Sequence, residues 1–191
     1  MAGAQVPCAY SECVSDEEGQ APAPSRLLWL VFVVAAVVVL LDQLTKHWAA
    51  TSIRERIESG EGAIEIVGSL LKFTYAENTG AAFSIGTGFT WIFTSVAIVV
   101  VIVIIRTASR LTNPAWAIAL GGLLGGSLGN LIDRMTRDPG PFRGYVVDFI
   151  QVPNFPIFNV ADMAIVGSSI LMVVLSVRGV EFSKSSQKVS A

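Results

Sequence analysis

The chain has 191 residues, of which 52% are hydrophobic and only 15% are charged. Soluble domains carry about 25% charged residues, so this composition and a mean hydropathy of +0.62 argue against a soluble domain and indicate a membrane protein. The formal net charge of −2 argues against a nucleic-acid-binding protein, which normally presents a basic patch.

Residues 1–25 are rich in Ala, Pro, Ser and acidic residues, a composition typical of a disordered tail. A cleaved secretory signal would begin with a positively charged region, whereas here four acidic residues precede the single Arg26. We therefore expect a retained first helix. Cys8 and Cys13 match no common metal-binding spacing and are interpreted as free thiols.

Four apolar segments follow, with approximate limits 27–48, 89–105, 115–132 and 160–177. A helix needs about 17 to 25 residues to cross a hydrocarbon core of roughly 30 Å. The sequence therefore predicts four transmembrane helices. Lys and Arg are divided almost evenly between the two sides, so the positive-inside rule does not fix the orientation.

The third segment is rich in glycine. Gly121, Gly125 and Gly129 recur every fourth residue and therefore share one face of a helix. Small residues at this spacing allow two helices to approach closely in lipid. We predict a helix-packing face here, with no chemical role.

The connection 51–88 between the first two spans is too long for a simple turn. Apolar and polar residues alternate over 64–66 and again over 71–75, on either side of Gly68 and Ser69. Period-two alternation around such a turn predicts a short β-hairpin. Four nearby aromatic residues fit an interfacial belt: Trp48, Phe73, Tyr75 and Trp91.

Polar residues cluster at one side of the predicted spans, where ionisable groups are costly and usually functional. Given four spans, all of these clusters converge at the same interface. They are Asp42 with Lys46, Asn78 with Gly80, Asn130 with Asp133 and Arg134, Asp148, and Asn159 with Asp162. We predict a polar pocket built by all four helices.

Each cluster also has a purely structural interpretation. Asp42 and Lys46 could form an i,i+4 ion pair. Asp133, at the C-terminal end of a helix, needs a cation such as Arg134 or Lys46.

The remaining acids have structural interpretations as well. Asp148 could lie on a strand with its side chain facing water. Asn159 could cap the fourth helix with Asp162 at the third helical position, and do nothing more.

The available side chains limit the chemistry. His47 is the only histidine, both cysteines lie in the tail, and there is no H-E-x-x-H motif. Carboxylates remain: two Asp in one site cannot both ionise cheaply, so one can act as a base on water while the other stays protonated. No metal or cofactor is needed.

Two alternatives stay open. A rhomboid-like serine protease could use Ser127 with His47 as its base. A small membrane transporter or channel could use the polar cluster as a binding site at one interface, although transporters usually place such groups near the midplane.

Five segments, taken together and in this order, resemble the lipoprotein signal peptidase (signal peptidase II) family. The resemblance covers roughly 27–178. The segments are Asp42-Gln43-Leu44-Thr45-Lys46, Asn78-Thr79-Gly80-Ala81-Ala82-Phe83, Gly129-Asn130-Leu131-Ile132-Asp133-Arg134, Val147-Asp148-Phe149 and Phe158-Asn159-Val160-Ala161-Asp162.

The resemblance implies an all-α integral membrane fold of four transmembrane helices with a small extracytoplasmic β-rich cradle. It implies an aspartyl endopeptidase whose catalytic residues are Asp148 and Asp162. The residues expected to bind substrate or support the site are Asp42, Lys46, Asn78, Gly80, Asn130, Asp133, Arg134 and Asn159.

The resemblance also implies a substrate and a location. The substrate is a prolipoprotein, cut just before a cysteine that bears a diacylglyceryl group, and membrane lipid surrounds the enzyme. We expect a monomeric, multi-pass protein of the bacterial inner membrane, with a peptidase domain over 26–180, cytoplasmic tails over 1–25 and 181–191, and an active site near the extracytoplasmic face. No nucleic-acid partner is expected.

Overall fold

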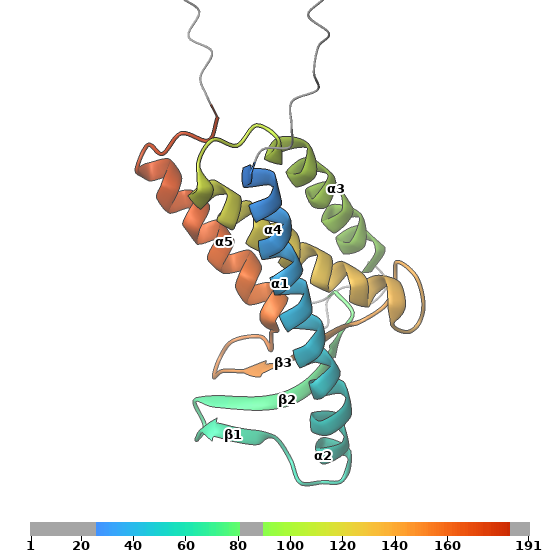
Figure 1. Cartoon of the computed structure of the whole chain (residues 1–191). Helices are drawn as coiled ribbons and strands as arrows, with labels where there is room; N and C mark the ends of the chain where they lie inside the picture. Colours follow the sequence, from blue (N-terminus) through green and yellow to red (C-terminus); the bar gives the residue numbers. More distant parts are fainter. Residues whose placement is uncertain (1–25, 81–89, 184–191) are drawn as a thin grey trace, which may run out of the picture.

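The computed structural model describes residues 26–80 and 90–183. The predicted N-terminal tail, the end of the Asn78–Phe83 segment and most of the C-terminal tail lie outside these residues. Figure 1 shows a bundle of four long helices with a small sheet across one end, which we call the sheet end. The predicted fold class is confirmed.

Within the described residues, four helices are long and apolar enough to cross a membrane, as the sequence predicts. They are α1 (Arg26–Trp48), α3 (Thr90–Ala108), α4 (Pro114–Thr136) and α5 (Val160–Val177). The first helix is longer than predicted, because α1 continues through a π-helical turn, η1 (Ala49–Ile53), into α2 (Arg54–Glu58). Most of the exposed large apolar side chains lie on α1, α3 and α5, as expected for surfaces that face lipid.

Helix α4 is the most buried of the four, because its glycines admit neighbours on two faces. A Cβ on Gly125 would lie 2.8 Å from the carbonyl oxygen of Ala35 in α1. One on Gly126 would lie 2.5 Å from the carbonyl oxygen of Ala161 in α5. The α1-facing row is Gly121, Gly125 and Gly129, as predicted, and the unpredicted α5-facing pair is Gly122 and Gly126.

The sheet has three antiparallel strands in the order β1-β2-β3. β1 (Ile64–Val67) and β2 (Leu71–Asn78) form the predicted hairpin, and β3 (Val146–Gln151) comes from the connection between α4 and α5. In register, Ala76 lies opposite Asp148 and Asn78 opposite Val146. The sheet therefore brings a connection before α3 and one before α5 to the same place.

The sheet is anchored on the extension of the first helix. Ala49 and Ile53 of η1 form a buried cluster with Val147 and Phe149 of β3. Trp48 packs edge-on against Phe73 of β2, with ring centroids 5.5 Å apart. This packing fixes the face of β3 that carries Val147 and Phe149, so the intervening Asp148 is turned the other way.

Candidate active site

Asp148 occupies the middle of β3 and is 2% exposed. The predicted strand is present, but the interpretation that the Asp148 side chain faces water is wrong. Because Val147 and Phe149 face the hydrophobic cluster, the alternation of side chains along the strand directs Asp148 to the interior at the sheet end. Burial of this acid therefore follows from the packing of its two neighbours.

Both oxygens of Asp148 accept hydrogen bonds from neutral amides. Asn159 Nδ2 donates to Oδ1 over 2.6 Å, and Asn78 Nδ2 donates to Oδ2 over 2.8 Å. No ion pair reaches Asp148 from any described residue. Burial, reinforced by the nearby Asp162, raises the pKa of Asp148 to about 7 despite the two amide donors.

Asp162 lies in the first turn of α5, where the predicted capping arrangement is confirmed. The Asn159 side chain accepts from the backbone N–H of Asp162 over 3.0 Å, and Asp162 Oδ2 accepts from the backbone N–H of Asn159 over 3.2 Å. Asp162 Oδ1 also accepts from Asn130 Nδ2 over 2.8 Å. Capping is not the whole role, because the same Asn159 side chain donates to Asp148 and so joins the two acids.

Asn78 and Gly80 act together at the end of β2. The backbone N–H of Gly80 donates to Asn78 Oδ1 over 2.9 Å, which leaves the amide nitrogen of Asn78 directed at Asp148. Gly80 has a φ of +106°, a conformation that residues with a side chain rarely adopt.

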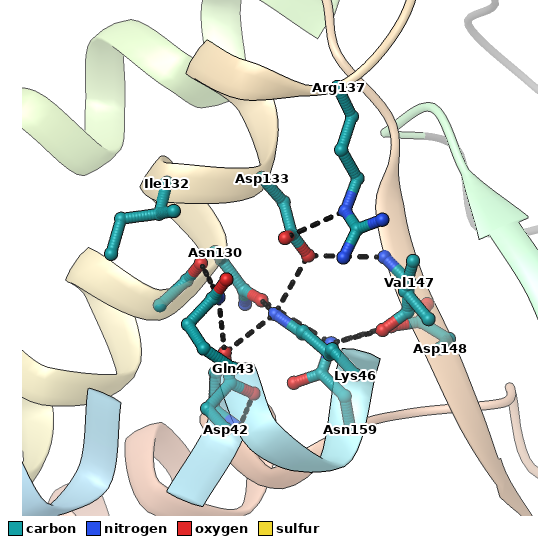
Figure 2. A network of polar contacts seen from close by, with 12 residues as sticks. Asp42, Gln43, Lys46, Asn130, Ile132, Asp133, Arg137, Val147, Asp148 and Asn159 are labelled. Atoms are coloured by element: carbon teal, nitrogen blue, oxygen red, sulfur yellow. Dashed lines mark hydrogen bonds and ion pairs between the residues drawn. The ribbon is translucent and has the colours of Figure 1, made fainter. Parts of the chain in front are cut away.

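A second group of charged side chains, centred on Lys46, lies near Asp148 and Asn159 (Figure 2). Lys46 Nζ lies 2.8 Å from Asp42 Oδ2, 3.0 Å from Asp133 Oδ2 and 2.9 Å from Asn130 Oδ1. These charged side chains are at most 1% exposed. The predicted i,i+4 ion pair is confirmed, and of the two cations proposed for Asp133, the ion pair forms with Lys46.

The sequence alone missed two members of this group. Arg137 Nε donates to Asp133 Oδ1 over 2.9 Å, and the i,i+4 spacing from Asp133 could have indicated it. Gln43 Nε2 donates to Asp42 Oδ2 and to the carbonyl oxygen of Gly129, each over 3.1 Å.

Backbone groups complete the network around these charges. Asp42 Oδ1 accepts from the backbone N–H of Ala161 over 2.9 Å, and Asp133 Oδ2 from that of Val147 over 3.2 Å. The network thus ties α1 and α4 to both segments that carry the acids.

Arg134 differs from the other cations at this end of the bundle. It is only 9% exposed, and its guanidinium carbon lies 5.8 Å from the centre of the Phe93 ring. Its Nη1 atom is buried and has no hydrogen-bond partner within the described residues. A buried donor without a partner is costly, which sets this atom apart from the paired cations Lys46 and Arg137.

The serine protease alternative finds no support in this arrangement. Ser127 is 6% exposed within α4, whereas His47 is exposed on α1. No hydrogen bond joins these two side chains. Across the described ranges 26–80 and 90–183, no three His, Cys, Asp or Glu side chains are grouped so as to hold a metal ion.

Comparisons with known proteins agree with this geometry. A sequence model of Signal peptidase (SPase) II matches residues 34–178. The lipoprotein signal peptidase of Mycolicibacterium smegmatis is 47% identical over 175 residues, covering 90% of this chain and 72% of the relative. That of Mycobacterium tuberculosis H37Rv is 46% identical over 165 residues, covering 86% and 79%.

A solved structure of a bacterial membrane enzyme, determined by the in meso method at 2.3 Å resolution, has the same fold. It superposes with a TM-score of 0.66 at 28% identity, covering 81% of this chain and 93% of that one. None of these matches supports a transporter or channel. The chain is a multi-pass bacterial membrane protein and belongs to the signal peptidase II family.

Proposed function

We propose that this membrane peptidase removes the signal peptide from prolipoproteins with Asp148 and Asp162 as its catalytic pair. One observation carries the assignment: two carboxylates at the sheet end are joined through Asn159 and receive hydrogen bonds from amides, with no cation paired to either among the described residues. Such a pair retains a proton near neutral pH, as aspartyl hydrolysis needs.

The reaction needs one water and one shared proton. The ionised carboxylate takes a proton from the water, whose oxygen attacks the scissile carbonyl carbon, while the protonated partner gives its proton to the carbonyl oxygen. In the resulting gem-diol, the carboxyl that took the proton from water gives it to the amide nitrogen, the other carboxylate takes a proton from one hydroxyl, and the C–N bond breaks. The products are a carboxylic acid and an amine, and the pair again holds one shared proton. The raised pKa of Asp148 supports a proton donor in this pair, which titrates as a unit.

Arg134 and Asn130 support the pair in different ways. The unpartnered Nη1 of Arg134 is suited to donate to a backbone carbonyl of the substrate, which fixes the peptide beside the acids. Asn130 holds Asp162 with its amide nitrogen and accepts from Lys46 with its oxygen. In this scheme Asp42, Lys46 and Asp133 hold the site together and do not react.

The relatives are named lipoprotein signal peptidases, which supports a prolipoprotein as the substrate. We propose that it is cut just before its diacylglyceryl-modified cysteine. The two acids lie at the sheet end, while α1 begins and α5 ends at the opposite end of the bundle (Figure 1). Following the resemblance to the family, we propose that both termini are cytoplasmic and that the acids lie near the extracytoplasmic face. The lipid chains stay in the bilayer, so a monomer of this enzyme meets its substrate by lateral diffusion.

A gel-shift cleavage assay tests the assignment, with purified protein in detergent and a diacylglyceryl-modified prolipoprotein. Asp148→Asn and Asp162→Asn should each lower the cleavage rate by about 100- to 10,000-fold, with melting temperatures near that of the wild type. Asp138→Asn, which makes the same change at an exposed acid, should cleave normally. Near-normal cleavage by either site variant would show that the acids are wrongly assigned.

A further inference from the structure

Helix α3 contributes neither an acid nor a member of the Lys46 network, yet its first turns touch both chain segments that flank the acid pair. Thr90 and Thr94 are 5% and 0% exposed. They lie four residues apart, and Phe93 lies between them, so the three share one face of the helix. We call Thr90, Phe93 and Thr94 the entry face of α3.

Both threonines contact carbonyl groups outside their own helix. Thr90 Oγ1 donates to the carbonyl oxygen of Thr79 over 2.5 Å. Thr94 Oγ1 lies 3.0 Å from the carbonyl oxygen of Phe142 and 3.1 Å from that of Thr90 in its own helix, so its one proton is shared between the two. A helical hydroxyl usually bonds to the carbonyl four residues earlier, and Thr107 bonds only within α3. Thr90 and Thr94 differ from Thr107, because each hydroxyl contacts a carbonyl oxygen of another part of the chain.

The two contacted carbonyl groups belong to chain segments that lead into the site. Thr79 stands between Asn78, which donates to Asp148, and Gly80, which orients the Asn78 amide. Phe142 lies in the loop that leads from α4 into β3 and has a φ of +68°, a conformation that the surrounding structure must hold in place.

Phe93 connects the other side of the site. A Cβ on Gly80 would lie 2.8 Å from the Phe93 ring, so the ring abuts the turn after Asn78. The Arg134 guanidinium lies over the same ring, 5.8 Å from its centre, at a separation typical of cation–π contacts. The ring thus sets the position of a guanidinium that has an unpartnered nitrogen.

We propose that the entry face of α3 is a positioning element: Thr90 holds Asn78 on the acid pair, Thr94 holds the loop into β3, and Phe93 aims Arg134 at the substrate. This inference rests on the proposed function. None of the three side chains is bonded to an acid, so each acts through a neighbour. Loss of Thr90 should affect the chemical step, whereas loss of Phe93 should affect substrate binding.

Steady-state cleavage of the diacylglyceryl-modified prolipoprotein separates the two effects. Thr90→Val removes the hydroxyl at constant shape and should lower kcat about three- to tenfold with little change in KM, the equivalent of one hydrogen bond. Thr90→Ser, which keeps the hydroxyl, should restore kcat. Phe93→Leu should raise KM about three- to tenfold and leave kcat within about twofold.

Matched controls make the same changes away from the site. Thr107→Val removes a hydroxyl that bonds only within α3, and Phe32→Leu shortens an aromatic side chain of α1 that is 42% exposed, close to the 47% of Phe93. Both should behave as wild type. Because Phe93 is exposed to this extent, its variant gives a readout even if Thr90→Val does not fold.

Two results would overturn the proposal. In the first, kcat and KM of Thr90→Val equal those of Thr107→Val, and kcat and KM of Phe93→Leu equal those of Phe32→Leu. In the second, Thr90→Val and Phe93→Leu lower the melting temperature and change kcat and KM to the same extent, and Thr90→Ser does not restore kcat. That result would mean that this face only packs against its neighbours. Asp148→Asn in the same assay keeps the two ideas apart, because its cleavage would refute the proposed function itself.

Discussion

Two groups of carboxylates lie side by side at the sheet end, and they have different hydrogen-bond and ion-pair partners. Asp42 and Asp133 surround the ammonium of Lys46, and Asp133 also binds Arg137. Asp148 and Asp162 have only amide side chains and a backbone N–H as donors among the described residues. We call Asp42 and Asp133, which form ion pairs with cations, the balanced group. We call Asp148 and Asp162, which form no ion pair within the described residues, the unbalanced group.

The difference separates holding the fold from doing chemistry. A buried acid that contacts a cation joins elements through the ion pair, and here the balanced group ties α1 to α4 and to the start of α5. A buried acid that has only neutral donors keeps its proton to higher pH, which suits it to proton transfer. Asn130 links the two groups, since it accepts from Lys46 and donates to Asp162.

Removing the cation of the balanced group should give the largest loss of stability. Lys46→Met would leave Asp42 and Asp133 buried without their shared ammonium and should destabilise the protein by about 3 to 5 kcal/mol. Lys72→Met breaks a 2.6 Å pair with Glu65 at the surface and should cost no more than about 1 kcal/mol. Thermal unfolding in detergent measures both, and equal melting temperatures would contradict the contrast.

The pH dependence of cleavage tests the unbalanced group. Because burial and Asp162 raise the pKa of Asp148 to about 7, the pair holds a proton below that pH and loses it above. The rate should therefore fall by about tenfold per pH unit above pH 7. A cleavage rate that stays constant from pH 7 to 9 would show that no proton of this pair is needed.

The same raised pKa has a consequence for stability. A pKa above the ordinary 3.8 favours the folded protein below about pH 4, and this contribution is lost as the pH rises through about 7.

The smallest expected effects come from removing two asparagine helix caps, one outside the site and one within it. Asn113 caps α4 by accepting from the backbone N–H of Ala115 over 2.8 Å, while Asn159 caps α5 and also binds Asp148. Asn113→Ala should cost about 1 kcal/mol and leave cleavage intact.

Asn159→Ala should cost at least as much stability as Asn113→Ala and should also lower kcat. Cleavage rates and melting temperatures of the two variants, taken together, decide this prediction. If both variants keep full cleavage, Asn159 is a cap only.

Local spacing predicted much of this structure. The four spans follow from the lengths of the apolar segments, and the hairpin from alternation of apolar and polar residues. The Asp42–Lys46 pair follows from i,i+4 spacing, and the cap at Asn159 from residue preferences at a helix start. All are present. The resemblance, and not the spacing, singled out Asp148 and Asp162.

What spacing could not predict depends on contacts between distant segments. Lys46 reaches Asn130, 84 residues away, because the glycine row of α4 lets α1 approach closely. Asn159 serves both acids only because β3 ends beside the start of α5. The burial of Asp148 likewise depends on the packing of Val147 and Phe149 against η1.

One paired measurement tests the division between the two groups most directly: the melting temperature and the cleavage rate of Asp133→Asn and Asp148→Asn, prepared side by side. The account predicts that Asp133→Asn lowers the melting temperature, since it loses its charge beside Lys46 and Arg137, and that Asp148→Asn melts no lower than wild type but does not cleave. A stable, inactive Asp133→Asn together with a cleaving Asp148→Asn would contradict it.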